Sequence, residues 1–123
     1  MTNEYGVSVG DIFYTSWGYE QTNVNFFQVV QLVGKMSVRV REVYLPMEDE
    51  KVISPMASDR TYKVVREMLP AATRSTFIED QEKGDLKRLK KYNDRDVYFI
   101  ADSFANAYKV ERDTITLYES WYA

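Results

Sequence analysis

The chain of 123 residues contains no cysteine and no histidine. The lack of cysteine excludes disulfide bonds and thiol nucleophiles, and the two absences together exclude zinc fingers and histidine metal sites. Without histidine, the chain also lacks the imidazole base on which many hydrolytic and phosphoryl-transfer mechanisms depend. We therefore expect no catalytic residues, no metal site and no cofactor, and we predict that the protein is not an enzyme.

Leader segments and long apolar runs are also missing. The opening residues have neither the basic start nor the apolar run of a signal peptide, and no stretch approaches the roughly 18 consecutive apolar residues of a membrane span. We expect a protein of the cytoplasm of a bacterial host, with no membrane partner. The length fits one domain that covers residues 1–123.

Charge is unevenly distributed along the sequence. The first 34 residues carry three acidic residues and no basic one, residues 35–95 carry 14 basic against 11 acidic residues, and residues 96–123 carry two against five. Acidic ends therefore flank a mildly basic middle. The net charge of −3 argues against nonspecific binding of duplex nucleic acid by the whole surface.

Few glycines and prolines interrupt the chain, and 15% of its residues are aromatic, a composition that favours strands. Strands are predicted at 11–17, 24–33 and 37–45, with Gly34 and Lys35 turning the last two into a hairpin. The second strand is apolar on both faces and should be central. In the third, the apolar positions change phase, which predicts a β-bulge or bend near Arg41–Glu42.

The rest of the chain is less regular in pattern. We predict a solvated loop at Glu48–Lys51 and strands at 61–69, 97–101 and 114–119. A short helix is predicted over 85–92 inside the polar segment 71–95, and one helical turn over 103–108. Together these elements predict a mainly β fold, a small and strongly bent SH3-like β-barrel of five or six strands with one minor helix.

Two stretches carry a resemblance to a known family. They are VGDIFYTSWGYEQTN at 9–23, continued by FFQVV at 26–30, and YESWYA at 118–123. The chain resembles a family of small uncharacterised proteins encoded by bacteriophages and other mobile elements, which share the first strand, the turn and the tyrosine-rich ending. It departs mildly at Glu20, where aspartate is usual, and at Phe27, where tyrosine is usual. The resemblance implies a mobile-element origin and no catalytic activity.

The turn after the first strand is the first candidate site. It combines large aromatic side chains with carboxylate, amide and hydroxyl groups, which is typical of an interface hot spot. The predicted partner-binding residues are Trp17, Tyr19, Glu20, Gln21 and Asn23. The alternative is structural: Trp17 plugs the barrel while Thr22 and Asn23 hold the turn.

A basic run is the second candidate site, for nucleic acid. Its residues are Lys87, Arg88, Lys90 and Lys91, and an exposed tyrosine strip, for which Tyr14, Tyr19 and Tyr118 are candidates, would stack bases beside it. The alternative is a solvated face whose charges serve solubility. The acidic groups Glu48–Glu50 and Glu79–Glu82 lack the converging geometry that a magnesium site needs, although imitation of phosphates by carboxylates stays open.

Three classes of function compete on this evidence. We expect a mobile-element accessory protein that binds a host protein, of which one form is an inhibitor of a host defence nuclease, as anti-CRISPR proteins are. The partner would then be a nucleic-acid enzyme. The alternative is a nucleic-acid-binding small β-barrel, and an enzyme is the third class.

Overall fold

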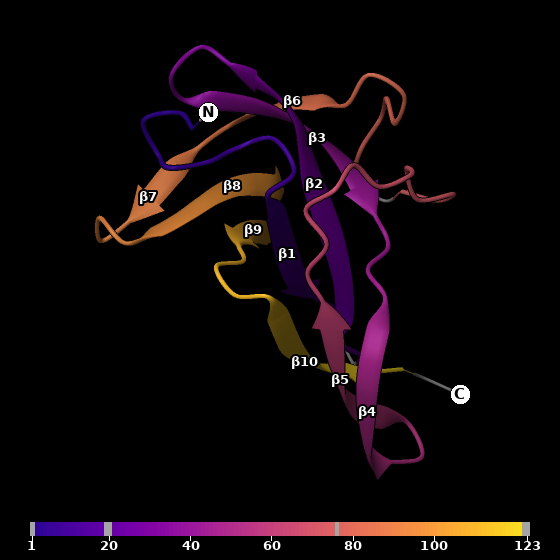
Figure 1. Cartoon of the computed structure of the whole chain (residues 1–123). Helices are drawn as coiled ribbons and strands as arrows, with labels where there is room; N and C mark the ends of the chain where they lie inside the picture. Colours follow the sequence, from indigo (N-terminus) through magenta and orange to yellow (C-terminus); the bar gives the residue numbers. More distant parts are fainter. Residues whose placement is uncertain (1, 19–20, 76, 122–123) are drawn as a thin grey trace.

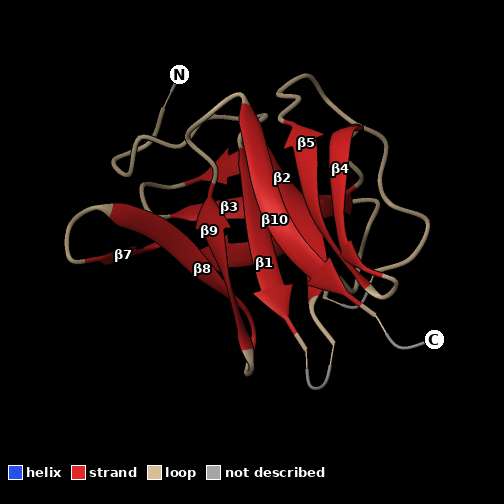
Figure 2. Ribbon diagram, turned by 90° about the horizontal axis from the view of Figure 1, so that it is seen from below, coloured by secondary structure: helices blue, strands red, loops and turns tan. Residues whose placement is uncertain are grey.

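The computed structural model describes residues 2–18, 21–75 and 77–121, and within these ranges the chain forms ten β-strands and no helix (Figures 1 and 2). The strands are β1 Ile12–Trp17, β2 Asn23–Val33, β3 Ser37–Val43, β4 Met47–Ser54, β5 Ala57–Lys63, β6 Asp85–Arg88, β7 Lys90–Tyr92, β8 Asp96–Asp102, β9 Ala105–Lys109 and β10 Thr114–Ser120. They form a seven-stranded sheet in the order β6-β3-β2-β1-β9-β8-β7 and a three-stranded sheet in the order β10-β5-β4. No described helix is long and apolar enough to cross a membrane.

The seven-stranded sheet curls until its two edges nearly meet. The edge strands β6 and β7 are consecutive in the chain and are separated by Leu89 alone. Leu89 is 1% exposed, and its N–H donates to the Met36 carbonyl over 2.7 Å. The segment is thus one bent strand that pairs with β3 through its first half and with β8 through its second. The prediction of a small, strongly bent β-barrel is confirmed, but the predicted five or six strands were too few, because the described residues form ten.

Two apolar cores lie on opposite faces of the central strands. The barrel interior holds Phe13, Phe27 and Phe99, whose ring centroids lie 5.1–5.6 Å apart along the Phe13–Phe99 and Phe27–Phe99 contacts. The second core, between the barrel and the three-stranded sheet, includes Ile12 and Phe26, and Figure 2 shows β10 in front of β1 and β2. The predicted hairpin of β2 and β3 is confirmed, and β2, which is apolar on both faces, is an internal strand that contributes to both cores.

The phase change in β3 has a different cause from the predicted bulge. Val38 and Val40 point into the barrel, whereas Val43 belongs to the second core. Between them Glu42 takes the inward position and is only 4% exposed, so a buried carboxylate interrupts the apolar pattern. The bulge near Arg41–Glu42 was a wrong prediction, because the irregularity between these strands lies in β2, between Val29 and Gln31.

Both predicted helical segments are strands. Over 85–92 the chain forms β6 and β7, and Leu86 and Leu89 point to opposite sides, with Leu86 54% exposed. The Asp85 carboxylate accepts the backbone N–H groups of Glu79 and Asp80, which precede it, instead of capping a helix. The helical turn predicted at 103–108 is also wrong, because β9 begins at Ala105.

Two further boundaries differ from the predictions. The loop predicted at Glu48–Lys51 is part of β4, whose side chains are all exposed. The strand predicted at 61–69 ends at Lys63. Beyond it, Gln28 of β2 donates to the Glu67 carbonyl over 2.7 Å and accepts the N–H of Leu69 over 2.8 Å. A buried side-chain amide thus replaces the ladder that a continued strand would have formed.

Candidate functional site

Trp17, at the end of β1, closes one end of the barrel. Its indole ring packs against Phe77 and Phe104, with ring centroids 5.7 and 5.2 Å away. Its Nε1–H donates to the side-chain oxygen of Asn25 over 2.5 Å. The ring is half-buried, so it fills the barrel end while one edge borders the surface. Trp17 therefore fills the end of the barrel, as its structural role requires, and also contributes to a candidate binding surface.

A series of side-chain hydrogen bonds orients Asn25, which accepts the hydrogen bond of the Trp17 indole. Asn25 Nδ2 donates to Glu42 Oε2 over 3.1 Å, and Ser75 Oγ donates to Glu42 Oε1 over 2.9 Å. Because the Asn25 Nδ2 group donates to Glu42, the amide oxygen is oriented to accept the indole N–H. Sequence reasoning missed these three residues, and the polar interruption at Glu42 was the signal that could have found them.

The turn after β1 is joined to the C-terminal strand. Thr22 and Ser120 exchange both backbone hydrogen bonds, at 3.2 and 3.1 Å, and Thr22 N–H also reaches Ser120 Oγ at 2.8 Å. Within the turn, Gln21 Nε2 donates to Asn23 Oδ1 over 3.3 Å. The two stretches that carry the family resemblance therefore meet in space. Tyr19 and Glu20, predicted as binding residues, lie outside the described residues.

An open cleft of about 530 Å³ lies where these stretches meet. Three of the predicted binding residues, Trp17, Gln21 and Asn23, line it together. The rest of its lining consists of residues that sequence reasoning did not select: Thr22, Val24, Asn25, Arg60, Glu119, Ser120 and Trp121. The pairing of β5 with β10 brings Arg60 and Glu119 to the cleft from opposite halves of the chain.

Arg60 organises the charged side of the cleft. Its Nε lies 2.7 Å from Glu50 Oε2, its NH1 lies 3.7 Å from Glu119 Oε1, and its guanidinium lies 4.8 Å from the centre of the Trp121 ring. The hydrogen bond to Glu50 is the main cause that raises the pKa of Arg60. Arg60 thus compensates one of the two negative charges of Glu50 and Glu119, and its guanidinium makes a cation–π contact with the Trp121 ring.

Tyr62 completes this group of side chains. Its hydroxyl donates to Glu119 Oε2. Burial of the ring raises the pKa of Tyr62, and the hydrogen bond to the Glu119 carboxylate raises it further. The Tyr62 hydroxyl therefore stays protonated well above the pH at which a free tyrosine ionises, and it fixes the position of Glu119 at the cleft.

The basic residues predicted for nucleic-acid contact lie along the bent strand. Lys87 and Arg88 belong to β6, and Lys90 and Lys91 belong to β7. Within the described residues no carboxylate forms an ion pair with any of these four. The Lys91 ammonium lies 5.2 Å from the centre of the Tyr5 ring.

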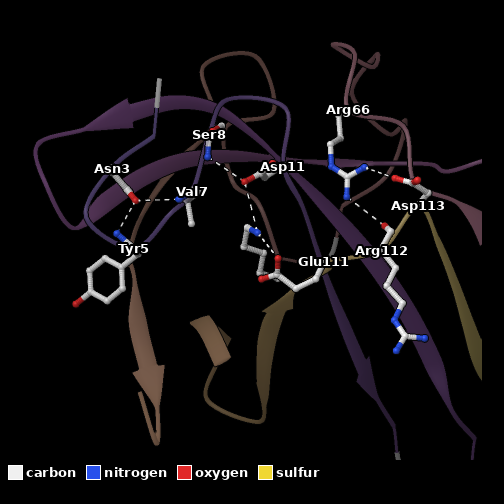
Figure 3. Close-up of polar contacts among 10 residues, drawn as sticks. Asn3, Tyr5, Val7, Ser8, Asp11, Arg66, Glu111, Arg112 and Asp113 are labelled. Atoms are coloured by element: carbon white, nitrogen blue, oxygen red, sulfur yellow. Dashed lines mark hydrogen bonds and ion pairs between the residues drawn. The ribbon is translucent and has the colours of Figure 1, made fainter. Parts of the chain in front are cut away.

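Two cations near the N-terminal segment, Lys109 and Arg66, do have carboxylate partners. The Lys109 ammonium lies 2.8 Å from Glu111 and 3.9 Å from Asp11, and its side chain is 12% exposed. Arg66 is bound to the Asp113 carboxylate and to the Arg112 carbonyl (Figure 3). These two cations are already partnered, whereas Arg88 and Lys90 of the bent strand are exposed and form no ion pair within the described residues.

The acidic groups do not converge. Glu48–Glu50 lie on the exposed strand β4, and Asp80 accepts backbone N–H groups of Glu82 and Lys83 within its own turn. Among the residues that the structure describes, no three carboxylates are grouped so that they could hold a metal ion.

Comparisons with protein-family models, with curated proteins and with solved structures found no match. The case for a function therefore depends on the side chains at the cleft and on the exposed faces of the two sheets.

Proposed function

We propose that the protein is a non-enzymatic accessory factor that acts by binding another protein, with the cleft between the turn at 17–25 and the end of β10 as its contact surface. The observation that carries this proposal is the convergence of Trp17, Gln21 and Asn23 with Trp121 on one opening. Trp and polar amide groups around a concave surface are typical of a hot spot with its polar rim.

The rigidity of the cleft supports this role. Trp17 is held by Asn25, the turn is held by Ser120, and Trp121 is held by Arg60 as well as by its backbone N–H bond to the Met56 carbonyl. A surface whose side chains are ordered before binding loses little conformational entropy when a partner docks. Side-chain amides at Gln21 and Asn23 supply directional donors and acceptors.

The charge around the cleft favours a basic partner. The first 34 residues carry three acidic residues and no basic one, and at the cleft wall the two carboxylates of Glu50 and Glu119 both pair with Arg60. A nucleic-acid enzyme presents a basic surface to its substrate, and an acidic blocker would be attracted to it. Together with the resemblance to mobile-element proteins, this favours inhibition of a host defence nuclease, in the manner of anti-CRISPR proteins.

Affinity capture from bacterial lysate tests the proposal, with and without nuclease treatment. Wild-type protein should capture a partner that resists nuclease, and Trp121→Ala combined with Asn23→Ala should lose it, because an anchor and its rim are removed. Tyr118→Ala is the matched control, since Tyr118 lies on β10 but points to the opposite face from Glu119.

Three results would contradict the proposal. Capture that disappears on nuclease treatment would mean that nucleic acid bridges the two proteins. Capture by the cleft variant equal to that of the wild type, with an unchanged melting temperature, would exclude the cleft as the contact surface. Loss of capture in the Tyr118 control, with its melting temperature unchanged, would place the contact on the other face of β10.

A further inference from the structure

Three tyrosines form a row across the barrel strands. Tyr14 of β1 lies directly opposite Tyr108 of β9, and Tyr108 lies directly opposite Tyr98 of β8. Their ring centroids are 6.3 and 5.7 Å apart along the row. Lys90 of β7 lies opposite Tyr98 and extends the row by one cation. Directly opposed residues of antiparallel strands point to the same face, so these four side chains share one surface.

This surface is the outside of the barrel. Val97, Phe99 and Ala107, which alternate with the tyrosines along the same strands, are buried in the barrel interior. The three-stranded sheet packs on the side of β1 and β2, whereas β7 and β8 extend away from it in both views (Figures 1 and 2). No described element covers the outer face of β7 and β8, and Tyr92 there is 61% exposed.

A hollow opens at one end of the row. Its volume is about 390 Å³, and it is lined by Tyr14, Tyr92, Asp96, Tyr108 and Lys109. Three tyrosine rings and one carboxylate give it the dimensions and the chemistry for a planar ring that carries hydrogen-bond donors. Lys109 is paired with Asp11 and Glu111, so the charged group of the hollow without an ion pair among the described residues is the Asp96 carboxylate.

Cations flank the row on one side. Arg88 and Lys90 are exposed and occupy alternate positions on either side of the buried Leu89, so both point outward with the tyrosines. Within the described residues neither forms an ion pair. A polyanionic backbone that ran along the bent strand would meet both charges while its bases lay across the sheet.

We propose that this tyrosine row is a binding site for single-stranded nucleic acid, with bases stacked on Tyr98 and Tyr108 and phosphates held by Arg88 and Lys90. A sheet face with aligned rings suits unpaired bases, because every base offers a π-face to an aromatic side chain. A duplex keeps its bases stacked within the helix, and two free cations beside Asp96 are too few to hold it by charge alone.

The hollow adds a preference among bases. The Asp96 carboxylate accepts hydrogen bonds and donates none. It therefore matches the exocyclic amino group of cytosine or adenine, which thymine lacks. The site does not depend on the protein-binding proposal, because the row and the hollow share no residue with the cleft lining.

Fluorescence anisotropy with a fluorescein-labelled oligodeoxycytidine of about a dozen nucleotides, a length within the usual site size, tests the proposal at low ionic strength. The purified wild-type protein should bind it. Tyr98→Leu and Tyr108→Leu, which keep apolar bulk but remove the π-face, should each weaken affinity about tenfold. Tyr98→Phe should retain the wild-type affinity.

Lys90→Gln provides a second variant that does not disturb packing, because Lys90 is exposed. It should weaken binding and reduce the slope of log affinity against log salt by about 0.7 in magnitude, as expected for one lost phosphate contact. Tyr118→Leu and Lys51→Gln, both on the outer face of the three-stranded sheet, are matched controls that should bind as the wild type does.

The outcomes separate clearly. Preference for oligodeoxycytidine over oligothymidine, with loss in both leucine variants and in Lys90→Gln, supports the site and its hollow. No binding by the wild type would overturn the proposal, as would equal competition by duplex. Wild-type affinity in Lys90→Gln, or in leucine variants whose melting temperature is unchanged, would overturn it as well.

Discussion

Thr22 and Ser120 are 98 residues apart in the chain, yet they exchange both of their backbone hydrogen bonds and a third bond runs from Thr22 N–H to Ser120 Oγ. The turn after β1 therefore owes its shape to the last strand of the fold. The cleft depends on the same link, because its lining comes from residues on both sides of this pair.

Removal of the Ser120 hydroxyl should loosen this link. In Ser120→Ala the Thr22 N–H keeps its longer bond to the Ser120 carbonyl and loses the 2.8 Å bond to Oγ. We expect a loss of about 0.5–1.5 kcal/mol in the free energy of unfolding, measured by urea denaturation. Thr114→Ala, at the exposed start of β10, is the control and should stay close to wild type; an equal loss there would mean that the link contributes nothing specific.

Gly18 shapes the other end of the same turn. Its φ is +142°, and a Cβ at this position would lie 2.0 Å from the Gln21 carbonyl oxygen. Gly18→Ala must therefore move backbone, and we expect a clearly lower melting temperature together with loss of partner capture. Gly34→Ala is the matched control: its φ is +59°, but no atom lies within 4 Å of its Cβ, so the cost should stay near 1–2 kcal/mol. Similar melting temperatures for the two variants would contradict the predicted clash.

Leu89 and Leu86 test how the barrel closes. Leu89 is 1% exposed at the corner between β6 and β7, whereas Leu86 is 54% exposed. Leu89→Ala should cost about 2–5 kcal/mol, as is usual for a buried leucine. Leu86→Ala should change stability by no more than about 0.5 kcal/mol. Thermal unfolding of both variants measures these changes in stability. Equal losses of stability would indicate that Leu86 and Leu89 share one buried face, as a helix over 85–92 requires.

The sequence was sufficient for the class of fold because the signals were local. The hairpin of β2 and β3 follows from a turn at Gly34 and from apolar residues on both faces of one strand. The bent strand was misread as a helix because Leu86 and Leu89 are spaced as on a helix face, and the partners that make it a strand, β3 and β8, lie far away in the sequence. Tertiary pairing outweighed local propensity there.

In the candidate sites too, residues that are neighbours in the sequence could be predicted, whereas residues brought together by strand pairing could not. Trp17, Gln21 and Asn23 could be chosen from the sequence because they are neighbours in one aromatic and polar turn. Arg60 and Trp121 could not, because their place at the cleft depends on the pairing of β5 with β10. The register of β1, β9 and β8 likewise aligns Tyr14 with Tyr108 and Tyr98. Of the predicted tyrosine strip, Tyr14 lies in this row and Tyr118 lies on β10, whereas Tyr19 lies outside the described residues.

The raised pKa of Tyr62 predicts a dependence of stability on alkaline pH. Burial is the main cause of the shift, and the hydrogen bond to Glu119 is the second. Above pH 10, the ordinary tyrosine value, the unfolded chain releases the Tyr62 proton while the folded chain retains it. The folded state then binds more protons than the unfolded state, so the free energy of unfolding falls as the pH rises.

Tyr62→Phe isolates this contribution from those of the other tyrosines. The variant should be less stable than the wild type at neutral pH, because the bond to Glu119 is lost. The difference should shrink as the pH rises above 10, since the wild type alone carries the Tyr62 linkage. Urea denaturation at several pH values measures it, with Tyr92→Phe as an exposed control. A difference that stays constant or grows with pH would mean that Tyr62 ionises equally easily in the folded and unfolded chains.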